Sequence, residues 1–471
     1  MSSTVEHSVK VGRAFAVEFK DIERWDPASY HAIRWNWPLS EMIRIGDLLT
    51  ARKDRVDRKQ WSFDKLQPVT VHNDGRISKR KLVEGRSYTM DLWFARPGDL
   101  LVAKIDLKNG AIAIVPEEWE NVAVTNHFVP FQIDHKRVVP EYLHRVFQMG
   151  VFRDLLWRNK VGAEGRKEVK LEFFLDQCVP LPPLATQRSI VAHWQAGMQQ
   201  AAALEAKAKE LVEEAQAGFV EALGIGANKA IEVPRAFALT SDQLERWSVG
   251  FLKQAIQGDA FGRSRFPVRR VSDVVSDLEN GWSPQCHGHP AKADEWGVLK
   301  LGAVSFGAYD EDENKALPST LKPIPAYEIK PGDVLISRAN VPRYVGACAV
   351  VHATRPKLLL CDKIFRVVFK PDSPLDGTYF AEVMKSPPLR QQIEAAITGS
   401  SPTMQNITKT ALLALCIPVP KLKEQHELVR ALTESREQAA RMMDQAETKR
   451  KETKEEVEGM VMGGATTTKT K

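Results

Sequence analysis

The sequence predicts an α+β protein with two similar α/β domains, each followed by a long helix, and the two long helices pair as an antiparallel coiled coil. Two segments carry this prediction. Residues 180–195 (PLPPLATQRSIVAHWQ) and 418–433 (PVPKLKEQHELVRALT) both open with Pro-x-Pro, place a Gln five residues after the second proline of that motif, and continue as a charged helical pattern. The step from Pro180 to Pro418 is close to half of the 471 residues. The chain is therefore interpreted as a tandem repeat.

Strand-like segments recur in the same order in the two halves. The clearest pair is a Pro-Gly-Asp turn followed by a short apolar run, at residues 97–104 and 331–338. Pro-Gly-Asp favours a turn, and the run after it is short enough for a buried strand. The other two pairs are residues 110–115 with 346–351, and residues 126–131 with 362–367.

A helical pattern follows each set of strands, at residues 142–147 and 379–384. A polar loop comes next, and we expect each loop to lead into an apolar strand that ends at Pro-x-Pro. Each half is thus a mixed strand-and-helix domain that ends in a long helix.

The long helical stretches, residues 185–223 and 421–462, contain no proline and show one apolar seam each. At 1.5 Å per residue, each helix would extend on the order of 55 Å. So narrow a seam needs a partner helix, and a two-fold relation between the halves would make the pair antiparallel, with the domains at opposite ends. The seam residues are Ile190, Trp194, Leu204, Leu211 and Phe219 in the first helix, and Leu428, Leu432, Met442 and Val457 in the second.

The helix stops set the expected boundaries. Gly224 and Gly226 follow the first long helix, and Gly463 and Gly464 follow the second, as is typical of helix C-termini. The expected division is a first domain at 1–183, a first helix at 184–226, a second domain at 227–420, a second helix at 421–463 and a disordered tail at 464–471.

The bulk composition is that of a globular protein. Hydrophobic residues make up 43% of the chain and charged residues 27%, and the formal net charge is +6. The sequence has no apolar run of membrane-spanning length, and its charged N-terminus differs from a signal peptide, so we expect a cytoplasmic protein. Five scattered cysteines indicate reduced thiols rather than a disulfide framework.

The repeat resembles the specificity subunits of type I restriction-modification enzymes. The resemblance is carried by the paired PLPPLATQR and PVPKLKEQH openings, the paired Pro-Gly-Asp strands, residues 277–284 (DLENGWSP) followed by 297–302 (GVLKLG), and residues 399–407 (GSSPTMQNI). In that family each globular part is a target recognition domain that reads one half of a split DNA sequence, and the helices hold two methyltransferase subunits. The first half lacks the Gly-x-Ser-Pro stretch, which is expected if the halves read different sequences.

The resemblance implies a DNA-binding subunit of a restriction system without chemistry of its own. Two domains on one rod would read two half-sites of double-stranded DNA, centred about one helical turn apart. The implied partners are two methyltransferase subunits and the restriction and translocase subunits. S-adenosylmethionine, ATP and Mg²⁺ would bind those partners, so no cofactor is expected on this chain.

One residue spacing is similar to that of the metal-binding residues in many nucleases. Pro97, Asp99, Asp106 and Lys108 follow the Pro-Asp … Asp-x-Lys spacing in which carboxylates hold Mg²⁺. The second copy retains Asp333 but lacks the Asp-x-Lys, so Asp99 is interpreted as a turn residue.

Two further patterns also have simpler interpretations. Residues 386–389 (SPPL) resemble an amino-methyltransferase motif, but Leu389 replaces the aromatic residue that stacks on the base, and a helix break is the preferred interpretation. Residues 286–289 (CHGH) lack a second ligand pair at zinc spacing and are interpreted as a polar loop. No catalytic, cofactor-binding or metal-binding residue is assigned.

Candidate DNA contacts lie in the polar loops beside the strands. Arg can read guanine, Asn and Gln can read adenine, and Lys mostly meets phosphate. For any single residue, a solvated surface charge is the competing interpretation. The candidates are Arg76, Lys79, Arg80, Lys81, Lys104, Lys108, Arg158, Lys160, Arg166 and Lys167 in the first half, and Trp282, Arg338, Arg343, Tyr344, Ser400, Ser401, Gln405 and Asn406 in the second.

Two other classes of function stay open. The chain could be a coiled-coil scaffold or an anti-restriction protein that does not read DNA, and acidic domain surfaces would favour that alternative. A nuclease or methyltransferase ranks third.

Overall fold

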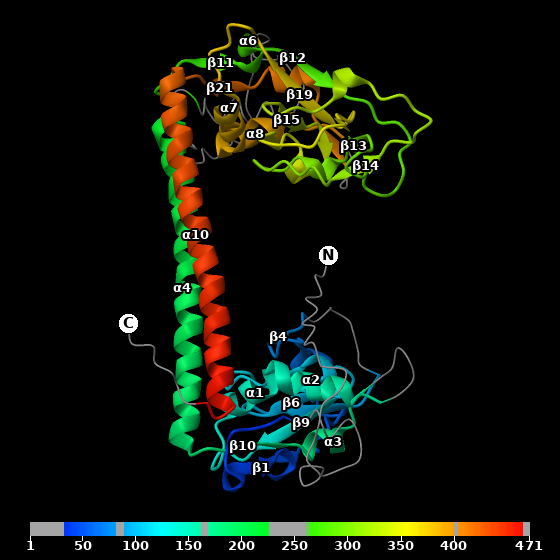
Figure 1. Cartoon of the computed structure of the whole chain (residues 1–471), viewed down its shortest axis with the longest axis vertical. Coiled ribbons are helices and arrows are strands. Elements are labelled where there is room, and N and C mark those ends of the chain that lie inside the picture. The colour runs from blue at the N-terminus through cyan, green and yellow to red at the C-terminus, as the bar shows by residue number, and fades with distance from the viewer. Residues whose placement is uncertain are drawn as a thin grey trace, which may run out of the picture. The chain divides into compact units, whose positions relative to one another are not determined.

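The computed structural model describes residues 33–81, 89–161, 168–225, 261, 263–399 and 404–464. The chain forms two compact units. Unit 1 combines Met1–Ala203 with Gln445–Lys471, and unit 2 is Leu204–Asp444. Each unit thus holds one globular part and a segment of both long helices (Figure 1). Residues 1–32 and 465–471, expected in the first domain and in the tail, lie outside the described residues.

The globular part of unit 1 is built on a four-stranded antiparallel sheet in the order β2-β9-β6-β7. All four residues of β6 are buried. Leu100 and Val102 face the main core, whereas Leu101 faces a second core under the neighbouring sheet, and burial on both faces explains the unbroken apolar run. The strands are β2 (Leu49–Ala51), β6 (Leu100–Ala103), β7 (Ile112–Ile114) and β9 (Phe128–Ile133).

A second sheet of unit 1 has the order β4-β3-β8-β5. Its central pair, β3 and β8, is parallel, and the two outer pairs are antiparallel. The strands are β3 (Gln67–Val71), β4 (Ile77–Lys79), β5 (Leu92–Ala95) and β8 (Val122–Thr125).

Unit 2 repeats this plan. Its antiparallel sheet has the order β12-β19-β15-β17, and a three-stranded sheet has the order β14-β13-β18 with a parallel β13–β18 pair. Leu335 of β15 faces the second core while its two neighbours face the main core, as in β6. The strands are β12 (Val275–Asn280), β13 (Gly297–Leu299), β14 (Asn314–Ala316), β15 (Val334–Ser337), β17 (Cys348–Val350), β18 (Leu358–Leu359) and β19 (Ile364–Phe369). The predicted duplication of the strands is confirmed.

The Pro-Gly-Asp turns are built alike in the two units. Gly98 and Gly332 have positive φ, as the third residue of a type II turn requires. The carboxylate of Asp99 accepts from the N–H of Arg96 at 2.7 Å, and that of Asp333 accepts from the N–H of Lys330 at 2.9 Å. Asp99 is therefore a turn residue, as predicted.

Two short helices follow each antiparallel sheet. The predicted helical segments form α1 (Pro140–Gln148) and α7 (Gly377–Lys385), and each is followed by a helix that was not predicted, α2 (Gly150–Arg158) and α8 (Pro387–Ala396). Ser386 separates α7 from α8 and prolines open α8, so the SPPL motif is the predicted helix break.

The expected apolar strand before each Pro-x-Pro is only partly correct. Its first residues form short helices, α3 (Leu171–Leu175) and α9 (Lys409–Leu413), and only three residues remain in each strand, β10 (Cys178–Pro180) and β21 (Cys416–Pro418). The reason is tertiary packing. Phe174 makes edge contacts with Phe147 and Phe152, which a helical turn allows.

Each of these short strands closes its unit by pairing with an early strand. β1 (Met42–Arg44) pairs with β10, and β11 (Val268–Arg270) pairs with β21 in the equivalent register. A buried tyrosine fixes each pair to the helix above it. The hydroxyl of Tyr142 donates to the carbonyl of Pro180 at 3.1 Å, and that of Tyr379 donates to the carbonyl of Pro418 at 2.9 Å.

The glutamine of each repeat is fully buried and joins the long helix to its globular part. The Gln187 Oε1 accepts from the N–H of Val139 at 2.8 Å, and its Nε2 donates to the carbonyls of Pro182 and Arg137 at 2.7 and 3.2 Å. Gln187 thus satisfies three backbone groups where α1 begins and where the long helix begins.

Gln425 makes the same set of bonds in unit 2. Its Oε1 accepts from the N–H of Asp376 at 2.9 Å, and its Nε2 donates to the carbonyls of Pro420 and Pro374 at 2.7 Å. Asp376 caps α7, so this joint has the same architecture as the joint in unit 1.

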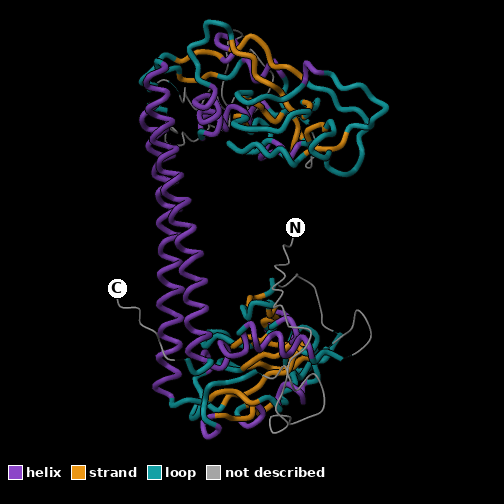
Figure 2. Tube along the Cα trace, in the orientation of Figure 1, coloured by secondary structure: helices purple, strands orange, loops and turns teal. Residues whose placement is uncertain are grey.

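The long helices are α4 (Leu184–Leu223) and α10 (Leu422–Val461), each about 60 Å long at 1.5 Å per residue. Both are helical throughout, whereas the globular parts mix strands, short helices and loops (Figure 2). Each ends at a glycine with positive φ, Gly224 or Gly463, as predicted. In both helices, the N–H of the residue after that glycine donates to the carbonyl oxygen of the residue five positions earlier. This hydrogen bond is the pattern of a Schellman cap.

The segments of α4 and α10 run antiparallel in both units. In unit 1, Nε2 of His193 lies 2.7 Å from the carboxylate of Glu456. In unit 2, Arg436 donates to Oε1 of Gln216 at 3.5 Å. The predicted pairing is confirmed, and all nine seam residues are buried or half-buried. Ile190, Val457, Phe219 and Leu432 enter the main cores at the helix ends.

The middle of the seam is made of small residues. Ala201 and Ala208 of α4 and Ala439 and Ala446 of α10 are buried at seven-residue spacing. Gly197 is the tightest position, because a Cβ there would overlap the side chain of Thr453. Small side chains of this kind let helix backbones approach closely.

We expect Gln187→Ala to destabilise unit 1 by about 2–4 kcal/mol, because the substitution leaves buried backbone groups without partners. Denaturant unfolding of the full chain, followed by circular dichroism, measures this loss. Gln195→Ala, on the exposed side of the same helix, is the matched control and should change the unfolding free energy by less than about 0.5 kcal/mol. Equal effects of the two substitutions would refute the role of Gln187.

The Gly197→Ala variant should be destabilised by about 1–2 kcal/mol, since the new methyl group meets Thr453. Gly218→Ala in the same helix meets no atom within 4 Å and should stabilise by about 0.5–1 kcal/mol through helix propensity. The melting temperatures of the two variants should therefore move in opposite directions. A rise in both would show that the helices have room at Gly197.

Candidate nucleic-acid interface

A two-stranded ribbon extends from the central strand of unit 2. β16 (Ala339–Asn340) follows β15 almost directly and pairs antiparallel with β20 (Gln405–Asn406). Arg338, between β15 and β16, ties the ribbon to the sheet. Its N–H donates to the carbonyl of Lys363 at 2.9 Å, and its carbonyl accepts from the N–H of Ile407 at 3.0 Å. The structure thus brings Arg338, Gln405 and Asn406 together.

Two stacked aromatic rings lie between two arginine side chains, in an arrangement that includes the turn after β16. The Arg390 guanidinium lies 5.1 Å from the ring centroid of Phe306, and the Phe306 and Tyr344 ring centroids are 5.7 Å apart. Arg343 lies 4.6 Å from the Tyr344 ring centroid and donates to its hydroxyl at 3.0 Å. Cation–π contacts hold these side chains in place while Arg343 itself stays exposed.

Asp362 organises the polar end of β19. Its carboxylate accepts from Ser283 at 2.5 Å and from Lys363 at 2.8 Å. Burial alone would raise the pKa of Asp362, but the hydrogen bonds from Lys363 and Ser283 outweigh burial and hold the pKa below its usual value. Trp282 is half-buried against the second core, so its indole is part of the scaffold as well as a predicted contact.

In unit 1, two loops with predicted contacts meet at Gly110. They are the β3–β4 turn, residues 72–76, and the β6–β7 loop, residues 104–111. A Cβ on Gly110 would lie 2.9 Å from the carbonyl oxygen of Asn73 and 2.9 Å from Nε of Arg153, so the turn, the loop and α2 are in close contact. The predicted contacts on these two loops are Arg76, Lys104 and Lys108.

His144 of α1 lies against both the β3–β4 turn and the residues that follow the β6–β7 loop. Its Nε2 lies 2.9 Å from the carbonyl oxygen of Ile112, and Arg145 donates to its Nδ1 at 2.7 Å. A Cβ on Gly75 of the β3–β4 turn would lie 2.6 Å from the same Nε2. Burial, with a smaller contribution from the charge of Arg145, lowers the pKa of His144 to about 4. The imidazole is therefore neutral in the folded chain at pH 7.

Three more of the predicted cations lie at the end of β4 and directly after it. The Lys79 ammonium lies 5.1 Å from the ring centroid of Trp119, and Arg80 donates to Oγ1 of Thr70 at 3.3 Å. Trp119 and Thr70 carry no charge, so these two contacts orient the cations without neutralising them. Lys81 follows them and is exposed.

Arg158 and Lys160 lie at the C-terminal end of α2. The Lys160 ammonium is 3.2 Å from the ring centroid of Trp157, which is 48% exposed.

Arg76 differs from the other cations, because Asp74 of its own turn pairs with it at 2.6 Å. Arg76 is consequently the least available of these cations for a phosphate.

Arg166, Lys167, Ser400 and Ser401 lie outside the residues that the structure describes. The roles of all the predicted contacts, described or not, stay predictions.

Sequence reasoning missed four residues of these surfaces, namely Phe306, Arg390, Arg153 and Trp157. Phe306 precedes Gly307 in a polar loop, and an aromatic residue in such a loop is a weak signal of an exposed ring. Arg390 and Arg153 lie on helices that were not predicted, so their partners could not be inferred.

The CHGH stretch of unit 2 lies in a loop. The His287 and His289 rings are stacked with their centroids 5.4 Å apart, and Nδ1 of His289 lies 2.9 Å from the carbonyl oxygen of Pro290. Among the described residues, no three His, Cys, Asp or Glu side chains gather as metal ligands would.

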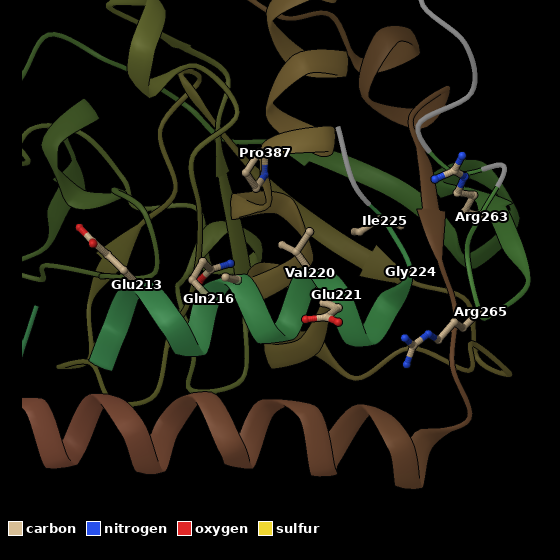
Figure 3. A pocket seen from close by; sticks show the side chains of 10 residues that line it. Glu213, Gln216, Val220, Glu221, Gly224, Ile225, Arg263, Arg265 and Pro387 are labelled. Atoms are coloured by element: carbon tan, nitrogen blue, oxygen red, sulfur yellow. The ribbon is translucent and has the colours of Figure 1, made fainter. Parts of the chain in front are cut away.

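A cavity of about 800 Å³ lies beside the C-terminal part of α4 in unit 2 (Figure 3). Glu213 and Glu221 contribute acidic side chains to its wall, and Arg263 and Arg265 contribute basic ones. With both signs present, the cavity wall does not favour an anionic ligand such as DNA.

No family model matches the chain. Over 152 residues, which are 32% of this chain and 25% of the relative, the sequence is 34% identical to the specificity subunit of the type I restriction enzyme EcoEI from Escherichia coli. The match thus spans about a quarter of the length of that relative.

One solved structure shares the fold at 18% identity. It belongs to a study of complex assembly and conformational transition of the type I restriction-modification system, with a TM-score of 0.54 over 89% of this chain and 96% of that chain. The sequence match confirms the predicted resemblance to a type I specificity subunit.

A second solved structure, the HsdS subunit from Thermoanaerobacter tengcongensis, is also 18% identical and matches 89% of this chain and 95% of its own, with a TM-score of 0.45.

In the part of the chain that is described, no helix combines the length and apolar character needed to cross a bilayer.

The neutral His144 predicts an acid-sensitive unit 1. Because the folded pKa is about 4 and the ordinary value is 6.5, the stabilisation is complete above pH 6.5 and is lost as the pH falls toward 4. Between pH 7.5 and pH 5, the wild-type chain should lose about 2 kcal/mol more unfolding free energy than His144→Gln. Denaturant titrations at the two pH values measure this difference.

Unit 2 offers an internal comparison, because Ala381 occupies the equivalent place in α7. The acid-dependent loss should therefore appear in unit 1. Identical pH slopes for the wild type and His144→Gln would contradict the prediction.

Proposed function

We propose that the chain is the specificity subunit of a type I restriction-modification complex and that it reads a bipartite double-stranded DNA target, one half-site with each unit. One observation carries the proposal. The same strand end bears predicted cations in both units, with Lys104 and Lys108 after β6, and Arg338 and Arg343 after β15.

The scaffold around these strand ends supports the proposal. Asp99 and Asp333 are both engaged in turns, so these two carboxylates do not oppose a phosphate backbone from the exposed loops. The loops also differ between the units, as is required of two readers with different half-sites. Basic loops of this kind favour DNA binding over a DNA mimic, which would present acidic surfaces.

In this proposal the chain supplies positioning and no chemistry. The methyltransferase subunits would dock on the outer faces of α4 and α10 and would bring S-adenosylmethionine, and the restriction and translocase subunits would bring ATP and Mg²⁺. The resemblance and the exposed charged flanks of both helices support this assignment of partners.

Methylome sequencing of cells with and without the gene tests the proposal. The expected result is a split methylated motif that disappears when the gene is removed. Exchange of residues 1–183 for the first domain of a relative should change one half of the motif and leave the other half intact. A methylome that does not depend on the gene, or a change in both halves, would refute independent reading by the two units.

A further inference from the structure

The β16–β20 ribbon has two unlike faces. The register sets the buried Ala339 opposite Asn406 and Asn340 opposite Gln405. Continued by one more residue along each strand, it places Val341 next to Met404. Because alternate residues of a strand share a face, Val341, Met404 and Asn406 lie on the same side of the ribbon. Val341 is 38% exposed and Met404 is 43% exposed, and Asn406 is also exposed. This side is called the reading face below.

The opposite face carries Asn340 and Gln405, whose amides are used within the chain. Oδ1 of Asn340 accepts from the N–H of Val341 at 2.8 Å, and its Nδ2 donates to Oγ of Ser337 at 3.3 Å. Nε2 of Gln405 donates to the carbonyl of Gly399 at 3.3 Å. The sequence predicted Gln405 and Asn406 as equivalent contacts, whereas the ribbon geometry separates them onto two faces.

The reading face combines one exposed amide with two exposed apolar side chains. In the major groove, an Asn side chain can bond N6 and N7 of adenine at once, and apolar groups contact the methyl group of the paired thymine. The major groove is also wide enough for a two-stranded ribbon. We infer that the reading face of unit 2 recognises an A·T base pair in the major groove of its half-site, an inference that rests on the proposed function.

The neighbouring stack supplies the phosphate contact that such docking needs. Arg343 is exposed, and its guanidinium is fixed against Tyr344. Arg390 donates to the carbonyls of Val345 at 2.7 Å and Arg343 at 3.3 Å, which holds the backbone of this turn in place. Arg390 is therefore a positioning residue for the cation beside the ribbon.

Unit 1 differs at the equivalent place. The loop after β6 carries Lys104 and the 46% exposed Ile105, and no ribbon is present among its described residues. The inference thus concerns the half-site of unit 2, which is the half-site left intact when residues 1–183 are exchanged.

Methylome sequencing of cells that express Asn406→Ala, Met404→Ala or Gln405→Ala in place of the wild type tests the inference. Asn406→Ala should lower the preference for A·T at one position of the unit 2 half-site by roughly tenfold to a hundredfold. Met404→Ala should weaken the preference at the same position by a smaller factor, and Gln405→Ala should leave the motif unchanged. The melting temperature of each purified variant verifies that the full chain folds.

The results distinguish a failure of the proposed function from a failure of this inference alone. An absent methylated motif in the wild type overturns both the proposed function and this inference. A normal split motif that contains no A·T pair in the unit 2 half-site, or that Asn406→Ala leaves unaltered, overturns the inference alone. A loss of preference in Gln405→Ala but not in Asn406→Ala assigns recognition to the opposite face and overturns it as well.

Discussion

A buried glutamine at the start of each long helix is the interaction on which the rest of the structure depends. Gln187 and Gln425 each bind the backbone at the start of a short helix and at the start of a long one, with no access to water. A buried amide in such a place holds its neighbours firmly, because every bond that it loses leaves a polar group unsatisfied. The first turns of α4 and α10 are thereby fixed to the globular parts whose cores their apolar residues enter.

Around this shared joint the two units use different chemistry. In unit 1, Arg145 lies over the ring of Trp194, 4.4 Å from its centroid. The equivalent residue of unit 2 is Glu382, which is buried and accepts two hydrogen bonds from Arg436. Burial alone would raise the pKa of Glu382, but the bonds from Arg436 and the charge of Lys385 outweigh it and lower the pKa. The globular part of unit 1 thus contacts α4, and that of unit 2 contacts α10, through different side chains, although the backbone plan is common to both.

The long helices and the Pro-Gly-Asp strands could be predicted because their patterns are local and occur twice. The helices α3 and α9 could not, since their sequences suit a strand and packing of residues such as Phe174 decides the outcome. The same limit of local sequence patterns applies to the candidate nucleic-acid interface. Composition located the polar loops, but the stack of Phe306, Tyr344 and Arg390 joins distant parts of the sequence. The two faces of the β16–β20 ribbon become distinct only once the register is known.

The division of the chain also governs the order in which the two units can fold during synthesis. Unit 2 is one continuous stretch, Leu204–Asp444, and all of it precedes the second segment of unit 1, Gln445–Lys471. Unit 1 is discontinuous. Val457 and Val461 belong to its core, and the N–H of Asn36 donates to the carbonyl of Met462 at 2.8 Å. The first half therefore cannot complete its core until the end of α10 has been synthesised, and a chain that stops short of α10 leaves that core unfinished.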